Sequence, residues 1–313
     1  MADILITGSE GFFGKNLCKY FREKGIKFKK TDLDKVNLTS IDETKKLITK
    51  VSPKIVINCA TGNYINKNYE PLVAEHNLRM FFNLYESINS DTVLITFGSG
   101  SEFNRLNWQK NMDESFLGKF LPADSHSFSK YVISNFVTHQ KKKKVLLFRV
   151  FGVYGPYEDY QFKFISNSIA KALFNIPITI NQNCIYDYVY IDDVCRLCLD
   201  IYKKKSFQKN FIGNFTPNSS IELLQIAKII QKLIPDTKIK VLKENIGTFY
   251  TGNNKKFLDN FGPFTFTSYE EGIFELFTKL KRNKKILSKE ILLKDDFIKY
   301  AKKLNKNYFE KNE

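Results

Sequence analysis

Short apolar runs alternate with amphipathic stretches through the first half of the chain. Five runs have the length and composition of buried strands, at residues 4–7, 28–32, 55–59, 93–97 and 145–149. The stretches between them repeat apolar residues at helical spacing, at residues 11–24, 41–50, 72–88 and 127–140. Strands that alternate with helices need crossover connections, which produce a parallel sheet covered on both faces. We therefore predict an α/β protein with a doubly wound parallel sheet of the Rossmann type.

The pattern changes after Gly155-Pro156. Helical periodicity returns at residues 162–174, 192–203 and 221–233, with short strands and turn-like segments between them. The segment after Lys284 is rich in lysine and weakly amphipathic, so we expect a surface helix with a frayed end. We predict a dinucleotide-binding Rossmann domain over residues 1–160, with a later return segment near 184–215. A smaller α/β lobe over 161–313 is expected to bind the substrate and to carry the C-terminal helix.

The chain is strongly basic, with 49 Lys and Arg against 33 Asp and Glu and a formal net charge of +16. The positive residues are mostly lysines spread along the chain, and no signature of an RNA- or DNA-binding module accompanies them. This pattern indicates a compositional bias that also attracts anionic substrates such as nucleotide diphosphates. We expect no nucleic-acid partner.

No apolar run approaches the length of a membrane span, and a strand-like run starts almost at the N-terminus. We therefore expect no membrane partner and no signal peptide. The five cysteines are scattered, and the C-x-x-C spacing of Cys195 and Cys198 lies in a predicted helix without the further ligands of a metal site. These cysteines indicate buried structural thiols, no metal and a reducing, cytoplasmic location.

A glycine-rich loop directly follows the first predicted strand and opens the first helix. Gly8, Gly11 and Gly14 form the pattern G-x-x-G-x-x-G in this strand–turn–helix context. Glycines permit the tight turn and let the backbone approach a pyrophosphate, while the helix N-terminus offers free N–H groups and a positive dipole end. The loop therefore predicts a bound dinucleotide.

Asp32 ends the second strand, where an acid accepts hydrogen bonds from the adenosine ribose hydroxyls and repels a 2′-phosphate. This position favours NAD as the cofactor. Lys29, Lys30 and Lys35 surround Asp32 and keep NADP open as the alternative.

Five segments in order resemble the extended short-chain dehydrogenase/reductases, the family of sugar-nucleotide epimerases, 4,6-dehydratases and 4-ketoreductases. The resemblance covers about residues 2 to 280. The segments are the glycine loop, NCA at 58–60, HN at 76–77, RVFGVYGP at 149–156 and YDYVYIDDV at 186–194. It implies a homodimer formed through two helices of each subunit, one of which carries Lys130. The residues expected to bind the cofactor are Gly8, Glu10, Gly11, Phe12, Phe13, Gly14, Asp32, Leu33, Cys59, Ala60, Thr61, Asn77, Lys130 and Phe151.

The family's catalysis uses a Ser or Thr together with a Tyr and a Lys spaced Y-x-x-x-K on a helix. Ser99 matches the family's Ser or Thr, with Ser101 as a possible substitute, and Lys130 matches the family's Lys. The Tyr position is His126. We predict Ser99, His126 and Lys130 as the catalytic residues.

The histidine leaves three interpretations open. An imidazole titrates near neutral pH, so His126 can itself exchange the proton, although the cation of Lys130 would lower its pKa, which helps a base and hinders an acid. Alternatively, another group or water supplies the proton. In the third interpretation the site has lost its chemistry and only binds a dinucleotide.

Two further positions depart from the family pattern. Gly152 replaces an Asn and Tyr186 replaces an Arg, both near the substrate or its diphosphate in the family. Lys163 or Lys171 is expected to compensate as an anion contact. The predicted substrate-binding residues are Ser101, Glu102, Gly152, Lys163 and Tyr186.

The segments at 98–103 and 157–162 resemble the branch of 4-ketoreductases that make deoxysugars for bacterial surface polysaccharides. The dehydratases of the family carry an acidic residue at the position that Ser101 occupies here. Glu102 lies one residue later, and in a strand this shift would point its side chain to the opposite face of the sheet. Dehydration is therefore disfavoured. We predict NAD(P)-dependent reduction of a 4-keto nucleotide sugar, with epimerisation or oxidation of a nucleotide sugar, or dinucleotide binding without catalysis, as alternatives.

Overall fold

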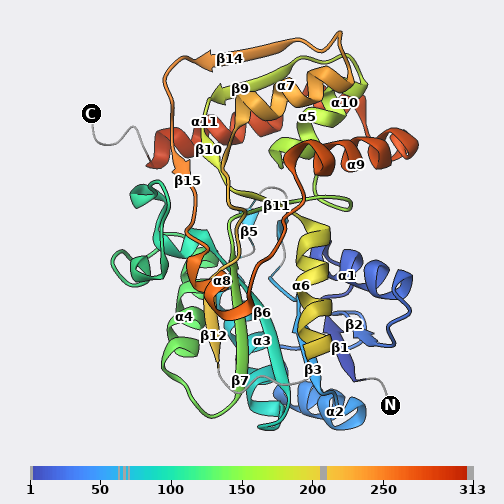
Figure 1. The fold of residues 1–313 in the computed structure, drawn as a ribbon, viewed down its shortest axis with the longest axis vertical. Coiled ribbons are helices and arrows are strands. Elements are labelled where there is room, and N and C mark those ends of the chain that lie inside the picture. The colour runs from blue at the N-terminus through green and yellow to red at the C-terminus, as the bar shows by residue number, and fades with distance from the viewer. Residues whose placement is uncertain (1–2, 63, 66–67, 70, 205–209, 309–313) are drawn as a thin grey trace.

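A parallel six-stranded sheet forms the centre of the protein in the computed structural model, which describes residues 3–62, 64–65, 68–69, 71–204 and 210–308 (Figure 1). Every neighbouring pair in the sheet is parallel. In sheet order the strands are β12 (Phe211–Asn214), β7 (Lys144–Val150), β6 (Val93–Ser99), β3 (Ile55–Asn58), β1 (Ile4–Thr7) and β2 (Lys29–Thr31). The predicted doubly wound α/β fold is confirmed.

The strand order reverses between β1 and β3. The chain leaves β1 for β2 on one side and then crosses back to β3 on the other side of β1. Connections that diverge in this way leave a crevice at the carboxyl ends of the two strands, where ligands bind in open α/β sheets. The glycine loop after β1 and residues Cys59 to Gly62 after β3 lie at this crevice.

Helices cover both faces of the sheet because the buried strands alternate their side chains. Ile4 and Ile6 face one hydrophobic core, and Leu5 faces the other. The helices on the first face are α1 (Phe12–Glu23), α6 (Ile191–Lys204) and α8 (Lys255–Phe261). Those on the second face are α2 (Ile41–Val51), α3 (Val73–Ser87) and α4 (Ser125–His139). The free thiols of Cys195 and Cys198 are buried within α6.

The later part of the chain builds a lobe over one end of the sheet, in the upper half of Figure 1. Its helices are α5 (Phe164–Leu173), α7 (Leu223–Leu233), α9 (Tyr269–Arg282), α10 (Lys289–Leu293) and α11 (Asp296–Tyr308). Its strands are β9 (Ile178–Gln182), β10 (Ile185–Tyr186), β13 (Ile221–Glu222), β14 (Ile239–Lys243) and β15 (Phe249–Tyr250), in two small sheets. The division of the chain into two domains at residue 160 stays a prediction.

Several further short elements complete the described fold. The strands are β4 (Tyr64–Ile65), β5 (Asn68–Tyr69), β8 (Gly152–Tyr154) and β11 (Tyr188–Tyr190). The 3-10 turns are η1 (Gly100–Phe103), η2 (Arg105–Asn107), η3 (Glu114–Phe116) and η4 (Lys284–Ile286). Among the described helices, none is both long and apolar enough to cross a bilayer.

The C-terminal helices are docked more firmly than their composition predicts. Leu292 and Ile298 are buried, and the ring of Phe297 lies 5.9 Å from that of Phe164. Lys171 of α5 is almost completely buried and places its ammonium 2.7 Å from the Asp295 carboxylate, between α10 and α11. This ion pair connects the C-terminal segment to the core of the lobe.

We expect Asp295→Asn to lower the free energy of unfolding by about 2–3 kcal/mol, because it leaves the buried Lys171 ammonium without its counter-charge. Chemical denaturation measures the effect. Adding Lys171→Met should restore most of the loss, since no buried charge then remains. The same substitution in the exposed pair of Asp259 and Lys255 should cost less than about 1 kcal/mol. Equal losses at Asp295 and Asp259 would contradict this account.

Candidate functional site

The glycine loop forms a cradle that side chains would fill. Gly8 has φ +64°, and a Cβ there would lie 2.5 Å from the backbone nitrogen of Ala60. A Cβ on Gly14 would lie 2.1 Å from the carbonyl oxygen of Gly8. Gly11 caps the N-terminus of α1, whose first N–H groups therefore face the loop. This backbone geometry fits the pyrophosphate of a dinucleotide, as predicted from the spacing of the three glycines.

Asp32 stands at the edge of this cradle. One of its oxygens accepts a hydrogen bond from the backbone N–H of Glu10 at 2.6 Å, and the other accepts one from that of Leu33 at 2.7 Å. The carboxylate is thus fixed in place while its remaining lone pairs stay available for ribose hydroxyls. The Lys30 ammonium forms an ion pair with the Glu10 carboxylate at 2.8 Å, so its charge is already partly neutralised.

Asn77 of α3 joins the far wall of the crevice to α4. Its side-chain oxygen accepts hydrogen bonds from the Gly62 N–H at 2.6 Å and the Thr61 hydroxyl at 3.2 Å. Its amide nitrogen donates to the Ser129 hydroxyl at 3.0 Å and lies 3.5 Å from Nδ1 of His126. Asn77 therefore sets the distance between the loop after β3 and the helix that carries the predicted catalytic residues.

The predicted catalytic residues come from two neighbouring elements. Ser99 is the last residue of β6 and is half-buried. His126 and Lys130 lie one helical turn apart on α4. The N-cap of this helix is Asp124, whose carboxylate accepts the Ser127 N–H. The Lys130 ammonium donates to the carbonyl oxygen of Phe97 in β6 at 3.0 Å. The structure thus brings α4 and the end of β6 together beside the cofactor crevice.

The imidazole of His126 is neutral at physiological pH. Burial and, to a smaller extent, the nearby cations of Lys130, Arg105 and Lys163 together lower its pKa to about 3, against the opposing effect of Asp124. The expected direction of the shift is confirmed, although burial contributes more than Lys130. A neutral imidazole can donate a hydrogen bond but does not serve as a cationic acid, and this shift makes it a weak base.

Glu102 is completely buried, and both of its oxygens are used. One accepts the backbone N–H of Ser99 at 2.7 Å, and the other accepts the Ser134 hydroxyl at 2.6 Å and Nε of Arg149 at 2.9 Å. The assumption that residues 101 and 102 continue a strand is wrong, because residues 100–103 form the 3-10 turn η1. The role of Glu102 as a substrate contact stays a prediction, but the structure shows it fixing the Ser99 segment.

The other predicted substrate contacts differ in their exposure. Lys163 is exposed at the start of α5, and Tyr186 is half-buried in β10. Gly152 packs against Tyr188, whose ring atom would lie 2.5 Å from a Cβ at this position. Lys171 is buried against Asp295, so the expectation that it could serve as an anion contact is wrong.

Three aromatic or charged residues that the sequence did not single out lie near the end of β6. The Tyr250 ring of β15 packs against Gly100, the residue after Ser99, where a Cβ would lie 2.8 Å from that ring. The Trp108 ring stacks on the Tyr250 ring at 3.9 Å, and the Arg105 guanidinium lies 5.0 Å from the Trp108 ring. Positions 100 and 250 are far apart in sequence, so no local spacing could have indicated this contact.

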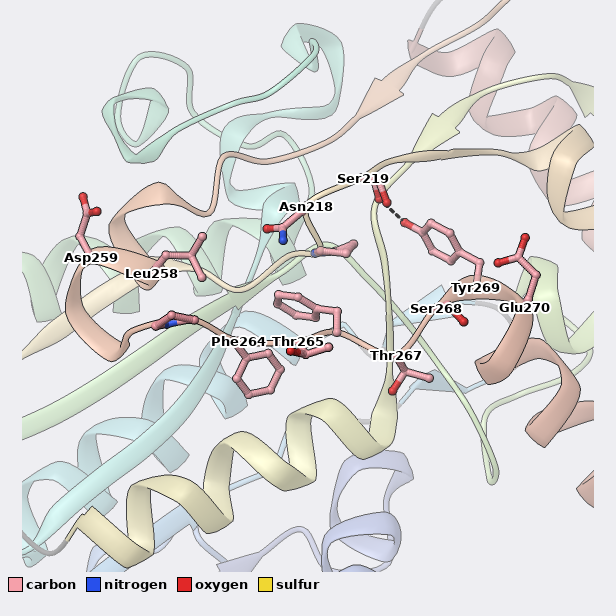
Figure 2. A pocket seen from close by; sticks show the side chains of 13 residues that line it. Asn218, Ser219, Leu258, Asp259, Phe264, Thr265, Thr267, Ser268, Tyr269 and Glu270 are labelled. Atoms are coloured by element: carbon pink, nitrogen blue, oxygen red, sulfur yellow. Dashed lines mark hydrogen bonds between the residues drawn. The ribbon is translucent and has the colours of Figure 1, made fainter.

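A hollow lies elsewhere, on the C-terminal part of the chain (Figure 2). It measures about 720 Å³ and is lined by residues 217–219, 258–259 and 263–270. Tyr269 donates a hydrogen bond there to the carbonyl oxygen of Ser219 at 2.7 Å (Figure 2). None of the predicted cofactor or catalytic residues lines this hollow.

We expect Gly14→Ala to weaken the binding of nicotinamide cofactor severely and to lower the free energy of unfolding by about 1–3 kcal/mol, because the new methyl group overlaps the Gly8 carbonyl. Intrinsic fluorescence quenching by NADH and chemical denaturation measure the two effects. Gly11→Ala is the matched stability control, since its Cβ would approach the Gly8 carbonyl only to 3.4 Å. Equal stability losses in the two variants would contradict this geometry.

We expect the His126 imidazole to show no titration between pH 5 and pH 8 in nuclear magnetic resonance spectra, with the signal assigned by His126→Gln. The unfolded chain takes up a proton at this residue below about pH 6.5, whereas the folded protein does so only near pH 3. The wild-type protein should therefore lose stability as the pH falls through this window, and His126→Gln should reduce that loss. A His126 midpoint near 6.5 would contradict the burial of this ring.

Comparison with known proteins agrees with this geometry. A model of the NAD dependent epimerase/dehydratase family matches residues 4–212. A GDP-L-fucose synthetase from Naegleria fowleri superposes with a TM-score of 0.74 and 19% identity, over 92% of this chain and 96% of that one. An ADP-L-glycero-D-manno-heptose-6-epimerase from Helicobacter pylori has a TM-score of 0.74 and 21% identity, over 88% and 95% of the chains. A dTDP-4-dehydrorhamnose reductase from Bacillus anthracis, in complex with NADP, has a TM-score of 0.70 and 18% identity, over 89% and 100%.

These structures share the fold at low sequence identity, whereas the family model matches most of the chain. The match contains the glycine loop, the end of β6 and α4, which carry the predicted cofactor and catalytic residues. The chain therefore belongs to the NAD dependent epimerase/dehydratase family, which consists of NAD(P)-dependent enzymes that act on nucleotide sugars.

Proposed function

We propose that the protein reduces the 4-keto group of a nucleotide-activated deoxysugar, with NAD favoured over NADP. The observation that carries the proposal is geometric: α4 brings His126 and Lys130 to the end of β6, where Lys130 donates to the Phe97 carbonyl at 3.0 Å, two residues before Ser99. Oxidation of a sugar alcohol, which also begins many epimerisations, needs a base to take the hydroxyl proton, and an imidazole with a pKa of about 3 is a poor one. Reduction instead creates a strongly basic oxygen, which accepts a proton from a neutral donor.

Each predicted catalytic residue has a distinct role in this proposal. A reduced nicotinamide bound in the crevice supplies the hydride. Ser99 and His126 donate hydrogen bonds to the carbonyl oxygen of the sugar, and the neutral imidazole acts as a fixed dipole. Lys130, fixed by the Phe97 carbonyl, positions the nicotinamide ribose and adds a positive charge near the developing oxyanion.

The cofactor preference and the substrate class rest on the surroundings of the site. The fixed carboxylate of Asp32 can accept hydrogen bonds from ribose hydroxyls, and Lys30 is already paired with Glu10, which supports NAD. Lys163 is exposed at the start of α5 and suits the diphosphate of a nucleotide sugar. A role in surface polysaccharide synthesis, a homodimer and a cytoplasmic location stay predictions, as does the absence of a nucleic-acid or membrane partner.

We expect one of a panel of GDP-, CDP- and dTDP-4-keto-6-deoxy sugars to oxidise NADH or NADPH rapidly in the presence of the purified protein, as followed by absorbance at the nicotinamide band. His126→Phe should lower kcat by about 10-fold to 100-fold, which is the expected effect of one lost hydrogen-bond donor to the oxyanion. Asp32→Ala should weaken NADH binding more than NADPH binding.

Turnover with none of these sugars would contradict ketoreduction. If the protein then interconverted nucleotide sugars without net cofactor oxidation, an epimerase would be favoured. Tight cofactor binding without either reaction would favour the binding-only interpretation, which the replacement of the family's Tyr by His126 makes reasonable.

A further inference from the structure

The neutral imidazole of His126 can carry its single hydrogen on either ring nitrogen, and the hydrogen bond that the other nitrogen makes decides between the two tautomers. Nδ1 of His126 lies 3.5 Å from the side-chain nitrogen of Asn77 in α3. The direction of this contact therefore determines which nitrogen of the ring is the N–H donor. The proposed function needs such a donor toward the sugar oxygen.

Two hydrogen-bond donors fix the orientation of the Asn77 amide. The backbone N–H of Gly62 lies 2.6 Å from one end of this amide, and the Thr61 hydroxyl lies 3.2 Å from the same atom. A backbone N–H can only donate, so the atom that faces Gly62 is the amide oxygen. If the amide were reversed, its NH2 group would face the Gly62 N–H and two donors would be in contact. The amide nitrogen therefore points toward α4.

Ser129 of α4 supports the same orientation. Its hydroxyl donates its only hydrogen to the carbonyl oxygen of His126 at 2.6 Å. Ser129 must therefore accept the hydrogen bond that joins it to the Asn77 nitrogen at 3.0 Å. This bond uses one hydrogen of the Asn77 NH2 group, and the other is available to Nδ1 of His126. Asn77 is 4% exposed and Ser129 is fully buried, so solvent has little access to these groups.

We propose that Asn77 is a positioning residue that holds His126 as its Nε2–H tautomer. Because the Asn77 nitrogen donates to Nδ1, this atom keeps its lone pair and the hydrogen of the ring lies on Nε2. The inference rests on the proposed function, in which His126 donates a hydrogen bond to the sugar oxygen. Asn77 acts through the imidazole alone and needs no contact with the sugar.

The alternative states of the ring are disfavoured by the same geometry. A hydrogen bond of 3.5 Å is weak in itself, but a hydrogen on Nδ1 would place two donors against each other in a buried position. This conflict opposes the Nδ1–H tautomer and the imidazolium equally. Burial and the nearby cations also oppose the imidazolium, because they lower the pKa of His126. The contact with Asn77 thus explains which neutral tautomer forms, which burial alone does not.

Asn77→Asp keeps the size of the side chain and the acceptor for Gly62, but it replaces the donor to Nδ1 by an acceptor. A hydrogen on Nδ1 would then donate to the new carboxylate. ¹⁵N resonances of the ring, assigned with His126→Gln, distinguish a nitrogen that carries a hydrogen from one that has only a lone pair. The wild-type protein should show a hydrogen on Nε2 alone, whereas Asn77→Asp should show a hydrogen on Nδ1.

Asn83→Asp is the matched control. It makes the same chemical change on the same helix, where the Asn83 amide donates to the carbonyl oxygen of Leu38 at 2.9 Å. This variant should leave the ¹⁵N resonances of His126 and the rate of reduction unchanged.

Kinetics test the consequence for the reaction, with the sugar that the wild-type protein reduces. Rates are compared above the His126 midpoint of each protein, so that every ring carries one hydrogen. Asn77→Asp should lower kcat by about 10-fold to 100-fold, the loss expected for His126→Phe, and should leave the KM for the sugar nearly unchanged. In a His126→Phe background, the same substitution should change kcat by less than about 3-fold, because the imidazole through which Asn77 acts is absent.

The outcomes separate this inference from the proposed function. A wild-type protein that reduces no sugar overturns the proposed function, whereas the ring spectra need no turnover and still test the tautomer. A wild-type ring with its hydrogen on Nδ1 overturns the inference, and this measurement does not depend on the folding of an Asn77 variant. An Asn77→Asp ring that keeps its hydrogen on Nε2 alone also overturns it. An equal loss of kcat from Asn77→Asp with and without His126 overturns the route through the imidazole.

Discussion

The buried ion pair of Glu102 and Arg149 is the interaction on which the geometry of the site depends. The Glu102 carboxylate connects the last residue of β6, Ser134 of α4 and Arg149 of β7. It fits there because Gly98 has no side chain, since a Cβ would lie 2.5 Å from the carboxylate oxygen. Both partners are fully buried, so removing either one leaves an uncompensated charge in the interior. The position of Ser99 is thus set by a charge in the core and not by the loop around it.

The same pair extends to the C-terminal lobe. Arg149 donates to the side-chain oxygen of Asn214 in β12, and the Asn214 amide donates to the carbonyl oxygens of Met112 and Asn253. The segment that carries Tyr250 is held next to this network, because Met112 N–H donates to the Thr251 carbonyl. One set of buried hydrogen bonds therefore connects the segment of the predicted catalytic serine to the segment of the lobe that contains Thr251 and Asn253. Neutral hydrogen-bond donors that are already fixed in position can stabilise an oxyanion in a site that excludes water, because they do not have to reorient as the charge develops.

Local patterns in the sequence predicted the sheet, the glycine loop and the family, because each depends on residues close together in the chain. The apolar run at residues 4–7, the glycine spacing and the helix that carries Lys130 are of this kind. The turn at 100–103 was missed because its cap, a carboxylate bound to Ser99, depends on the buried Arg149. Tyr250 was missed because tertiary packing alone brings its ring against Gly100 and Trp108. The ion pair of Lys171 and Asp295, which holds the C-terminal helices against the lobe, was missed for the same reason, because it joins residues 124 positions apart.

The most direct test of this account is a crystal structure of the protein with oxidised nicotinamide and the alcohol product of the sugar that it reduces. We predict that the product oxygen lies within hydrogen-bonding distance, about 2.5–3.2 Å, of Ser99 Oγ and of the His126 ring. A product oxygen that contacts neither Ser99 nor His126 would contradict the account.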